Sequence, residues 1–136
     1  MNPDPGTYVL ILQCRSEATI EVGKWGQLKL GRGYYIYVGS AFGPGCVRAR
    51  VKRHFRSNKP TRWHIDYLRE FAEPICAWCS HNPSRLEHLW AQIFSNMANF
   101  RSIKGFGCSD CHCYSHLFFT HDEPRFSLFC DMAQDD

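Results

Sequence analysis

The sequence lacks the features that mark membrane, secreted and fibrous proteins. It has no apolar run of 18 residues, so it predicts no membrane-spanning helix and no membrane partner. It shows no basic and apolar leader, which favours a cytoplasmic location. Repeats, low-complexity tracts and linkers are also lacking in its 136 residues. We therefore predict a single domain over 1–136, with its core over 5–130 and a frayed acidic tail over 131–136.

Acidic residues are scarce in one part of the chain. Between residues 48 and 69 lie eight Lys or Arg residues, half of the chain's 16, against the single acid Asp66, although the net charge is only +3. Such a basic patch is typical of proteins that bind a polyanion, and a solvated helix face is the alternative. The interleaved aromatics Phe55, Trp63 and Tyr67 favour nucleic acid with unpaired bases, which stack on aromatic rings.

Strand-forming residues dominate the first third of the chain. Apolar or alternating patterns predict strands over 7–14, 18–22, 27–30 and 34–38, the second and third forming a hairpin. Gly39 is expected to end the fourth strand. The remaining predicted segments are helices over 46–56, 61–72 and 83–98, a strand over 75–80, a loop over 101–115 and edge strands over 116–120 and 125–130. This order predicts an α+β fold, with a small antiparallel central sheet flanked by helices.

The stretch from 34 to 56 combines chemically active side chains. A strand ending at Tyr37 precedes a glycine-rich turn, and the helix that follows carries Arg50 and His54. Because these two residues are four apart, they share one helix face. We expect the phenol, guanidinium and imidazole to meet, while the core face of the helix carries Val47, Val51 and Phe55.

Several short motifs occur in a fixed order between residues 6 and 120. They are Gly6-Thr7-Tyr8, Tyr37-Val38-Gly39-Ser40-Ala41, the Arg50–His54 stretch, the Trp63–Leu68 stretch, Glu87 between Leu86 and His88, and Gly105-Phe106-Gly107 followed by Ser109-Asp110-Cys111. The ordered set resembles the GIY-YIG nuclease superfamily, in its small stand-alone Uri-type branch. It is also similar to the catalytic module of GIY-YIG homing endonucleases.

Three departures from the family pattern stand out. The gap between Tyr8 and Tyr37 is 28 residues, longer than the family usually has, and we attribute it to an extra hairpin between the two signature strands. Thr7 stands where the family has isoleucine, and β-branching is kept. Cys46 stands where a second glycine is expected before the helix.

The resemblance implies a metal-dependent endonuclease that hydrolyses DNA phosphodiester bonds, and the aromatics interleaved with the basic residues favour single-stranded or branched DNA as its substrate. It implies catalytic roles for Tyr8, Tyr37, Arg50, His54 and Glu87. One of the two tyrosines would be the general base, which the sequence does not decide. Glu87 would hold one Mg²⁺ or Mn²⁺, a hard cation that takes few carboxylates.

Further residues are expected around this site. The expected nucleic-acid contacts are Ser40, Arg48, Lys52, Arg53, Lys59 and Arg62. The expected rim of the site comprises Gly39, Cys46, His64, Ser109, Asp110 and Cys111.

The cysteines allow a different interpretation. Cys76 with Cys79, and Cys108 with Cys111, form two C-x2-C pairs separated by 28 residues, a spacing typical of structural zinc. His112, Cys113 and His116 would be spare ligands. Buried thiols are the alternative, because the first pair lies in a predicted strand. Two other functions thus stay open: a non-catalytic nucleic-acid-binding module of the same fold, and a zinc-stabilised interaction domain.

Overall fold

The computed structural model describes residues 6–23, 26–41, 46–56, 64–81, 86–97, 99–103, 106 and 115–124. Within them, five strands form one sheet in the order β5-β1-β4-β7-β6, and every pair in it is antiparallel. The strands are β1 (Gly6–Cys14), β4 (Gly33–Ala41), β5 (Glu73–Ser80), β6 (Arg101–Ser102) and β7 (Leu117–Thr120). The predicted α+β fold with a mainly antiparallel central sheet is confirmed.

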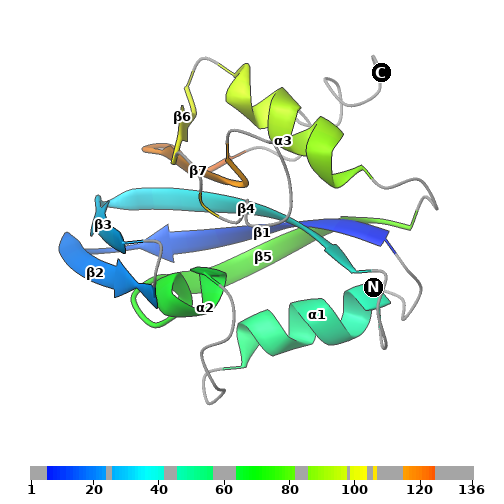
Figure 1. The fold of residues 1–136 in the computed structure, drawn as a ribbon, viewed down its shortest axis with the longest axis horizontal. Helices are drawn as coiled ribbons and strands as arrows, with labels where there is room; N and C mark the ends of the chain where they lie inside the picture. The colour runs from blue at the N-terminus through cyan, green and yellow to red at the C-terminus, as the bar shows by residue number, and fades with distance from the viewer. Residues whose placement is uncertain are drawn as a thin grey trace.

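Helices cover both faces of this sheet (Figure 1). The helix α1 (Cys46–Phe55) and the short α2 (His64–Arg69) lie on one face, and α3 (Glu87–Ser95) lies on the other. Side chains alternate along β1, so Tyr8 and Leu10 join the core beneath α1 and α2, whereas Val9 and Ile11 join the core beneath α3. The sheet is therefore buried on both sides at its centre.

The predicted hairpin is confirmed as a separate two-stranded sheet of β2 (Ala18–Val22) and β3 (Gly26–Leu30). Its inward side chains Ile20, Val22, Leu28 and Leu30 are buried in the same core as Tyr8. The alternation of apolar and polar residues that predicted these strands also fixes which face is buried. In the sequence, the hairpin lies between β1 and β4, the strands that carry Tyr8 and Tyr37.

Three strand predictions need correction. Gly39 does not end β4, which continues to Ala41 because Gly39 pairs with Tyr8 in the β1–β4 ladder. The strand predicted over 116–120 is present as β7, but it is not an edge strand, since β6 pairs with it. The loop predicted over 101–115 begins with β6, which is too short to produce a sequence pattern.

Two helix predictions also need correction. On α1, Phe55 was assigned to the core face, yet it is 41% exposed, while His54 is fully buried. The helix turns its imidazole rather than its last aromatic ring toward the sheet. The helix predicted over 61–72 is shorter, because α2 ends at Arg69 and a turn containing the exposed Phe71 follows.

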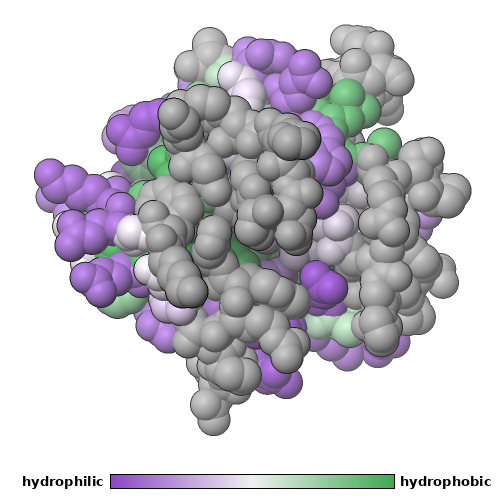
Figure 2. Space-filling model, viewed as in Figure 1, coloured by the Kyte–Doolittle hydropathy of each residue, from purple (hydrophilic) through white to green (hydrophobic). Residues whose placement is uncertain are grey.

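On the face shown in Figure 2, the described residues are mainly hydrophilic, with small separate hydrophobic patches. Among the described residues, no helix is long and apolar enough to cross a membrane. The predicted strand over 125–130 and the acidic tail over 131–136 lie outside the described residues.

Candidate active site

Tyr8 and His54 form the buried centre of the candidate site. The Tyr8 hydroxyl oxygen lies 2.7 Å from Nε2 of His54, although 46 positions separate the two residues in the chain. Tyr8 comes from β1 and His54 from α1, and both are almost inaccessible to solvent. Burial requires such polar groups to find partners, and here each is the partner of the other.

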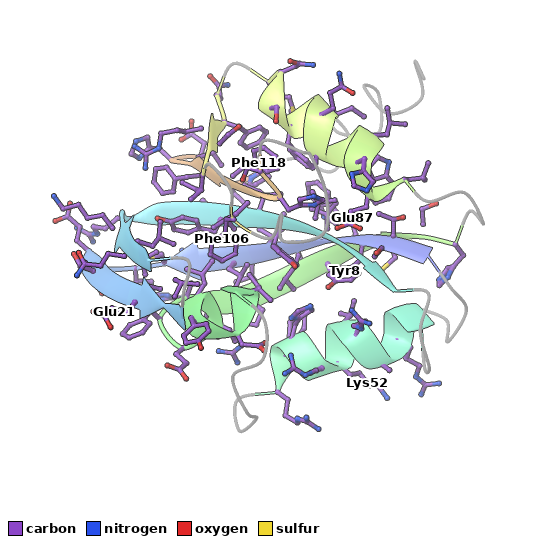
Figure 3. The ribbon with its side chains drawn as sticks, viewed as in Figure 1. Tyr8, Glu21, Lys52, Glu87, Phe106 and Phe118 are labelled. Carbon is purple, nitrogen blue, oxygen red and sulfur yellow. The ribbon has the colours of Figure 1, made fainter. Side chains whose placement is uncertain are left out.

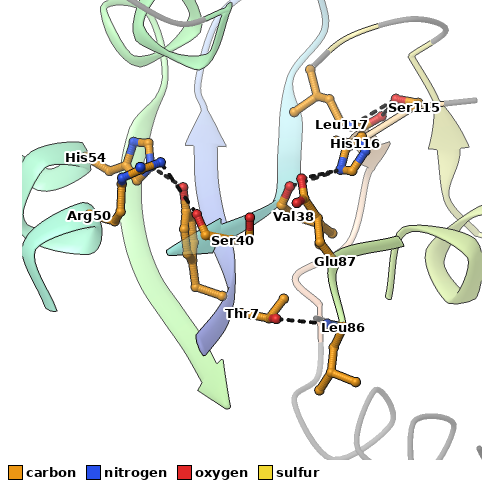
Figure 4. Close-up of polar contacts among 11 residues, drawn as sticks. Thr7, Val38, Ser40, Arg50, His54, Leu86, Glu87, Ser115, His116 and Leu117 are labelled. Atoms are coloured by element: carbon orange, nitrogen blue, oxygen red, sulfur yellow. Dashed lines mark hydrogen bonds and ion pairs between the residues drawn. The ribbon is translucent and has the colours of Figure 1, made fainter. Parts of the chain in front are cut away.

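Tyr37 and Arg50 complete this side of the site, as predicted from their positions along β4 and α1. The Tyr37 ring lies 6.4 Å from the Tyr8 ring and 6.1 Å from the His54 ring, measured between centroids. Arg50 donates from Nη1 to the backbone carbonyl of Ser40 at 3.5 Å. The Tyr37 phenol therefore lies close to the His54 imidazole, and Arg50 lies beside His54 on α1 (Figure 4).

The environment of Tyr8 raises its pKa well above the ordinary value for a phenol. Burial is the main cause, because it disfavours the charged phenolate, and the neighbouring Tyr37 adds to it. The positive charge of Arg50 acts in the opposite direction, and the negative charge of Glu87 raises the pKa further. Tyr8 is therefore a protonated phenol at neutral pH, and it donates to His54 in the tautomer whose Nε2 carries no hydrogen.

Glu87 reaches the same end of the sheet from the α3 side. It is the first residue of α3, where a carboxylate is favoured by the helix dipole. The preceding residue, Leu86, donates its backbone N–H to Oγ1 of Thr7 at 3.2 Å, which ties the start of α3 to the start of β1. Figure 3 shows Glu87 and Tyr8 near the same end of the central strands. Their proximity accounts for the effect of Glu87 on the Tyr8 phenol.

His116 joins Glu87 to β4. Its Nδ1 lies 3.1 Å from Oε2 of Glu87 and 3.3 Å from the carbonyl oxygen of Val38. The imidazole is buried, and burial lowers its pKa, while the Glu87 carboxylate and the Val38 carbonyl partly offset this. His116 is therefore mainly neutral at neutral pH.

The donor set around Glu87 fits one hard cation with most of its water retained. The His116 contact uses only Oε2 of a carboxylate whose side chain is 22% exposed. Mg²⁺ and Mn²⁺ are held in this way by one or two carboxylates. Among the described residues, no cluster of three or more His, Cys, Asp or Glu side chains forms a dedicated metal cage.

The first cysteine pair does not have the geometry of a zinc site. Cys76 pairs with Ile11 and Cys79 pairs with Tyr8, and the side chains of Ile11 and Tyr8 belong to opposite faces of the sheet. Cys76 and Cys79 therefore point to opposite faces, whereas two ligands of one zinc must converge. Both thiols also have a pKa raised by burial.

Two residues expected to contact nucleic acid or line the site have structural partners instead. Arg53 forms a bidentate ion pair with Asp66, with nitrogen–oxygen distances of 2.7 and 2.9 Å. This pairing holds α1 against α2 and uses the fork that a phosphate contact would need. Gly39 lies beneath the Tyr8 ring rather than at an open rim.

In the described part of the predicted basic patch, the exposed basic residues lie along the outer side of α1. Arg48, Lys52 and Arg56 are exposed and are spaced four positions apart, so they form one stripe. Figure 3 shows Lys52 on the side of α1 away from the sheet. We call these three residues the α1 basic stripe.

Other predicted residues lie outside the described part of the chain. They are Lys59, Arg62, Cys108, Ser109, Asp110 and Cys111, together with the side chains of Cys46 and His64. Their predicted roles at the rim, in nucleic-acid contact or in zinc binding stay predictions.

Comparison with known families adds one result to this geometry. Residues 7–135 match a family described as DUF123, a domain of unknown function. The chain belongs to the DUF123 family. The match extends over nearly the whole DUF123 chain, including every described site residue. No curated protein and no solved structure matches it.

Sequence reasoning missed the roles of two residues in this DUF123 domain. Thr7 appeared only as a β-branched replacement, yet its hydroxyl binds the start of α3. His116 appeared only as a spare zinc ligand, yet its ring contacts Glu87. In both cases the partner lies far away in the sequence, so only the tertiary fold reveals the contact.

Proposed function

We propose that this DUF123 domain is a metal-dependent endonuclease of the GIY-YIG type that hydrolyses DNA phosphodiester bonds. The observation that carries the proposal is the hydrogen bond between Tyr8 and His54, placed beside Arg50 and near Glu87 at one end of β4. Four of the five residues implied by the family resemblance come from separate elements of the fold, β1, β4, α1 and α3, and the fifth, His54, shares α1 with Arg50.

The arrangement supplies what attack of water on a phosphodiester needs. A base takes a proton from water as the water oxygen bonds to phosphorus. The bond from phosphorus to the leaving oxygen breaks, and that oxygen keeps the electron pair and takes up a proton. Arg50 is permanently charged and suits the phosphate oxygens, on which negative charge builds up. A cation held by Glu87 would supply further charge stabilisation at the same phosphate.

The Tyr8–His54 pair is our candidate for the base. In the tautomer of His54 whose Nε2 carries no hydrogen, Tyr8 can pass its proton to Nε2 as its oxygen accepts one from water. This relay avoids a free phenolate, which burial makes costly. Tyr37 is less buried than Tyr8 and lies beside it, so in this proposal Tyr37 orients the water.

The α1 basic stripe supports DNA as the substrate. Arg48 and Lys52 on α1, with Arg56 directly after it, lie on the side of the helix opposite Arg50 and His54, so the helix that carries these two site residues would also hold the phosphates of a bound strand. The exposed ring of Phe55 lies beside the stripe and offers a stacking surface for an unpaired base. Single-stranded or branched DNA is therefore the favoured substrate.

The test is a cleavage panel of labelled single-stranded, duplex, flap and junction DNA with Mg²⁺ or Mn²⁺. We expect nicking of the substrates with unpaired regions, and loss of nicking in Tyr37→Phe, Arg50→Ala and Glu87→Ala proteins that remain folded. Absence of cleavage of every substrate with both metals would refute the proposal.

The second candidate is a nucleic-acid-binding module without catalysis. The specific observation in its favour is the burial of Tyr8, which keeps the phenol protonated and so unable, on its own, to take a proton from water. Salt-sensitive DNA binding without any nicking would support this candidate.

A further inference from the structure

The ring of His116 is held between Glu87 and β4. The two groups near its Nδ1 are a carboxylate oxygen and a backbone carbonyl oxygen, at 3.1 and 3.3 Å. An ionised carboxylate and a carbonyl can only accept hydrogen bonds. The tautomer of the neutral ring that suits both oxygens therefore carries its hydrogen on Nδ1.

The position of His116 is fixed by its own backbone. Its carbonyl oxygen accepts from the N–H of Val38 at 2.9 Å, and its N–H donates to the carbonyl of Phe106 at 3.0 Å. The side chain then bonds the carbonyl of the same Val38. The ladder between β4 and β7 ends at the pair Tyr37 and Leu117, and the His116 ring extends it by one further bond. Rotation of this ring would break its hydrogen bond to the Val38 carbonyl.

Glu87 gains its orientation from this ring. It begins α3 after Leu86, a cap residue with no side-chain cap hydrogen bond, and the carboxylate is partly exposed on a flexible side chain. Ordering a glutamate side chain costs up to about 1.5–2 kcal/mol of conformational free energy. A buried donor that is already fixed removes part of that cost before a cation or substrate arrives.

We propose that His116 is a positioning residue, whose Nδ1–H holds the carboxylate of Glu87 in the orientation that binds a divalent cation (Figure 4). This rests on the proposed function for the role of Glu87. The rival explanation is structural, since the Nδ1–H could serve only to satisfy the buried carbonyl of Val38.

The first test compares two amide variants. The side-chain nitrogen of asparagine takes the place of Nδ1, and that of glutamine takes the place of Nε2. We expect His116→Asn to keep Mn²⁺ affinity within about threefold of the wild-type value, and His116→Gln to weaken it by about 10-fold or more. Electron paramagnetic resonance of added Mn²⁺ measures the affinity without any nucleic acid. His121→Gln, an exposed histidine just after β7, is the matched control and should bind as the wild type does.

Urea unfolding of each variant shows whether it is folded at the concentrations used. Equal Mn²⁺ affinities of the Asn and Gln variants, whether both high or both low, would overturn the proposal. The second test needs no variant: nitrogen-15 NMR of the imidazole at neutral pH should show His116 protonated at Nδ1 and unprotonated at Nε2. The opposite tautomer would also overturn the proposal.

The two proposals can fail separately. If the wild-type protein cuts DNA but the His116→Asn and His116→Gln variants bind Mn²⁺ equally well, the positioning role alone is overturned. If only the His116→Gln variant loses Mn²⁺ affinity but the wild-type protein cuts no substrate, the nuclease function alone is overturned.

Discussion

The ring of Tyr8 lies over the backbone of Gly39, its partner across β1 and β4. A β-carbon on residue 39 would stand 2.5 Å from the Tyr8 hydroxyl oxygen and closer still to the adjoining ring carbon. No side chain fits there without displacing the ring. The glycine of the second signature motif is thus required by the tyrosine of the first.

This contact predicts that Gly39→Ala destabilises the protein by about 1–3 kcal/mol, the usual cost of overpacking. Cleavage should also fall, because the displaced ring moves its hydroxyl away from His54. Urea denaturation measures the first effect. In a Tyr8→Ala background, Gly39→Ala should cost less than about 0.5 kcal/mol, since the obstruction is gone. Equal costs in the two backgrounds would show that the ring is not the cause.

Removing only the Tyr8 hydroxyl should separate catalysis from folding. We expect Tyr8→Phe to lower cleavage by about 10²–10⁴-fold, the range for loss of acid–base catalysis. The free energy of unfolding should fall by only about 0.5–1.5 kcal/mol for one hydrogen bond. Single-turnover cleavage and urea unfolding measure the two effects.

Tyr35→Phe is the matched control for this change. Tyr35 is equally buried, and its hydroxyl accepts from the N–H of Gly31 at 3.0 Å, on the side of the fold near the hairpin. Its variant should lose similar stability and keep its cleavage rate. Equal loss of cleavage in both variants would indicate a general effect of destabilisation.

Substitution of two neighbouring residues of α1 should affect different properties: stability for Arg53 and DNA binding for Lys52. Arg53→Ala leaves the buried carboxylate of Asp66 without its ion pair, so we expect a loss of about 3–5 kcal/mol in stability. Lys52→Ala, on the exposed stripe, should change stability by less than about 0.5 kcal/mol. It should instead weaken DNA binding and reduce the slope of log affinity against log salt by about 1.

Fluorescence anisotropy across a salt series, together with thermal unfolding, checks both variants. A Lys52 variant with an unchanged salt slope would remove the α1 basic stripe from the DNA surface. A fully stable Arg53 variant would show that the ion pair with Asp66 does not hold the two helices together.

The hydroxyl of Thr7 should prove important at the start of α3. Thr7→Val keeps the shape of the side chain but removes the acceptor for the N–H of Leu86, so we expect a loss of about 1 kcal/mol. Mn²⁺ affinity should fall with it, because Glu87 follows directly. Thr19→Val, on the exposed face of β2, is the control and should change neither quantity.

Alkaline pH should destabilise the fold through its buried phenols. Burial raises the pKa of Tyr8 in the folded protein, while the unfolded phenol ionises near about 10. The contribution of these phenols to the free energy of unfolding is therefore constant below that pH. It falls above that pH, because the phenols of the unfolded chain lose their protons first. Each such phenol contributes a slope of about 1.4 kcal/mol per pH unit. Tyr8→Phe should remove one such contribution and leave that of Tyr35, whose pKa burial also raises. An unchanged slope in urea unfolding between pH 10 and 11 would contradict this.

Local patterns predicted most of the elements. The apolar run of β1, the alternation in β2 and β3 and the four-residue spacing of Arg50 and His54 all depend on neighbours in the chain, which a sequence displays. The family resemblance predicted that Tyr8 would lie with those two residues, and the fold brings its hydroxyl oxygen within 2.7 Å of Nε2 of His54.

Contacts between residues far apart in the sequence could not be predicted from such local patterns. Nothing near Arg53 indicates that Asp66 would bind it, so its charge was assigned to nucleic acid. His116 and Glu87 lie 29 positions apart on elements that meet only in the folded protein. β6 is two residues long, and the sequence therefore placed β7 at the edge.

The hairpin leaves the main sheet after Cys14 and the chain returns at Gly33, and these two residues are direct partners in the ladder. The excursion thus begins and ends at a single point, at the opposite end of β1 from Tyr8. A longer hairpin, a shorter one or a tight turn could join these two residues while the alignment of β1 and β4 stays the same. Spacing between the two tyrosines is for this reason a poor guide to kinship, and their pairing across the strands is a better one.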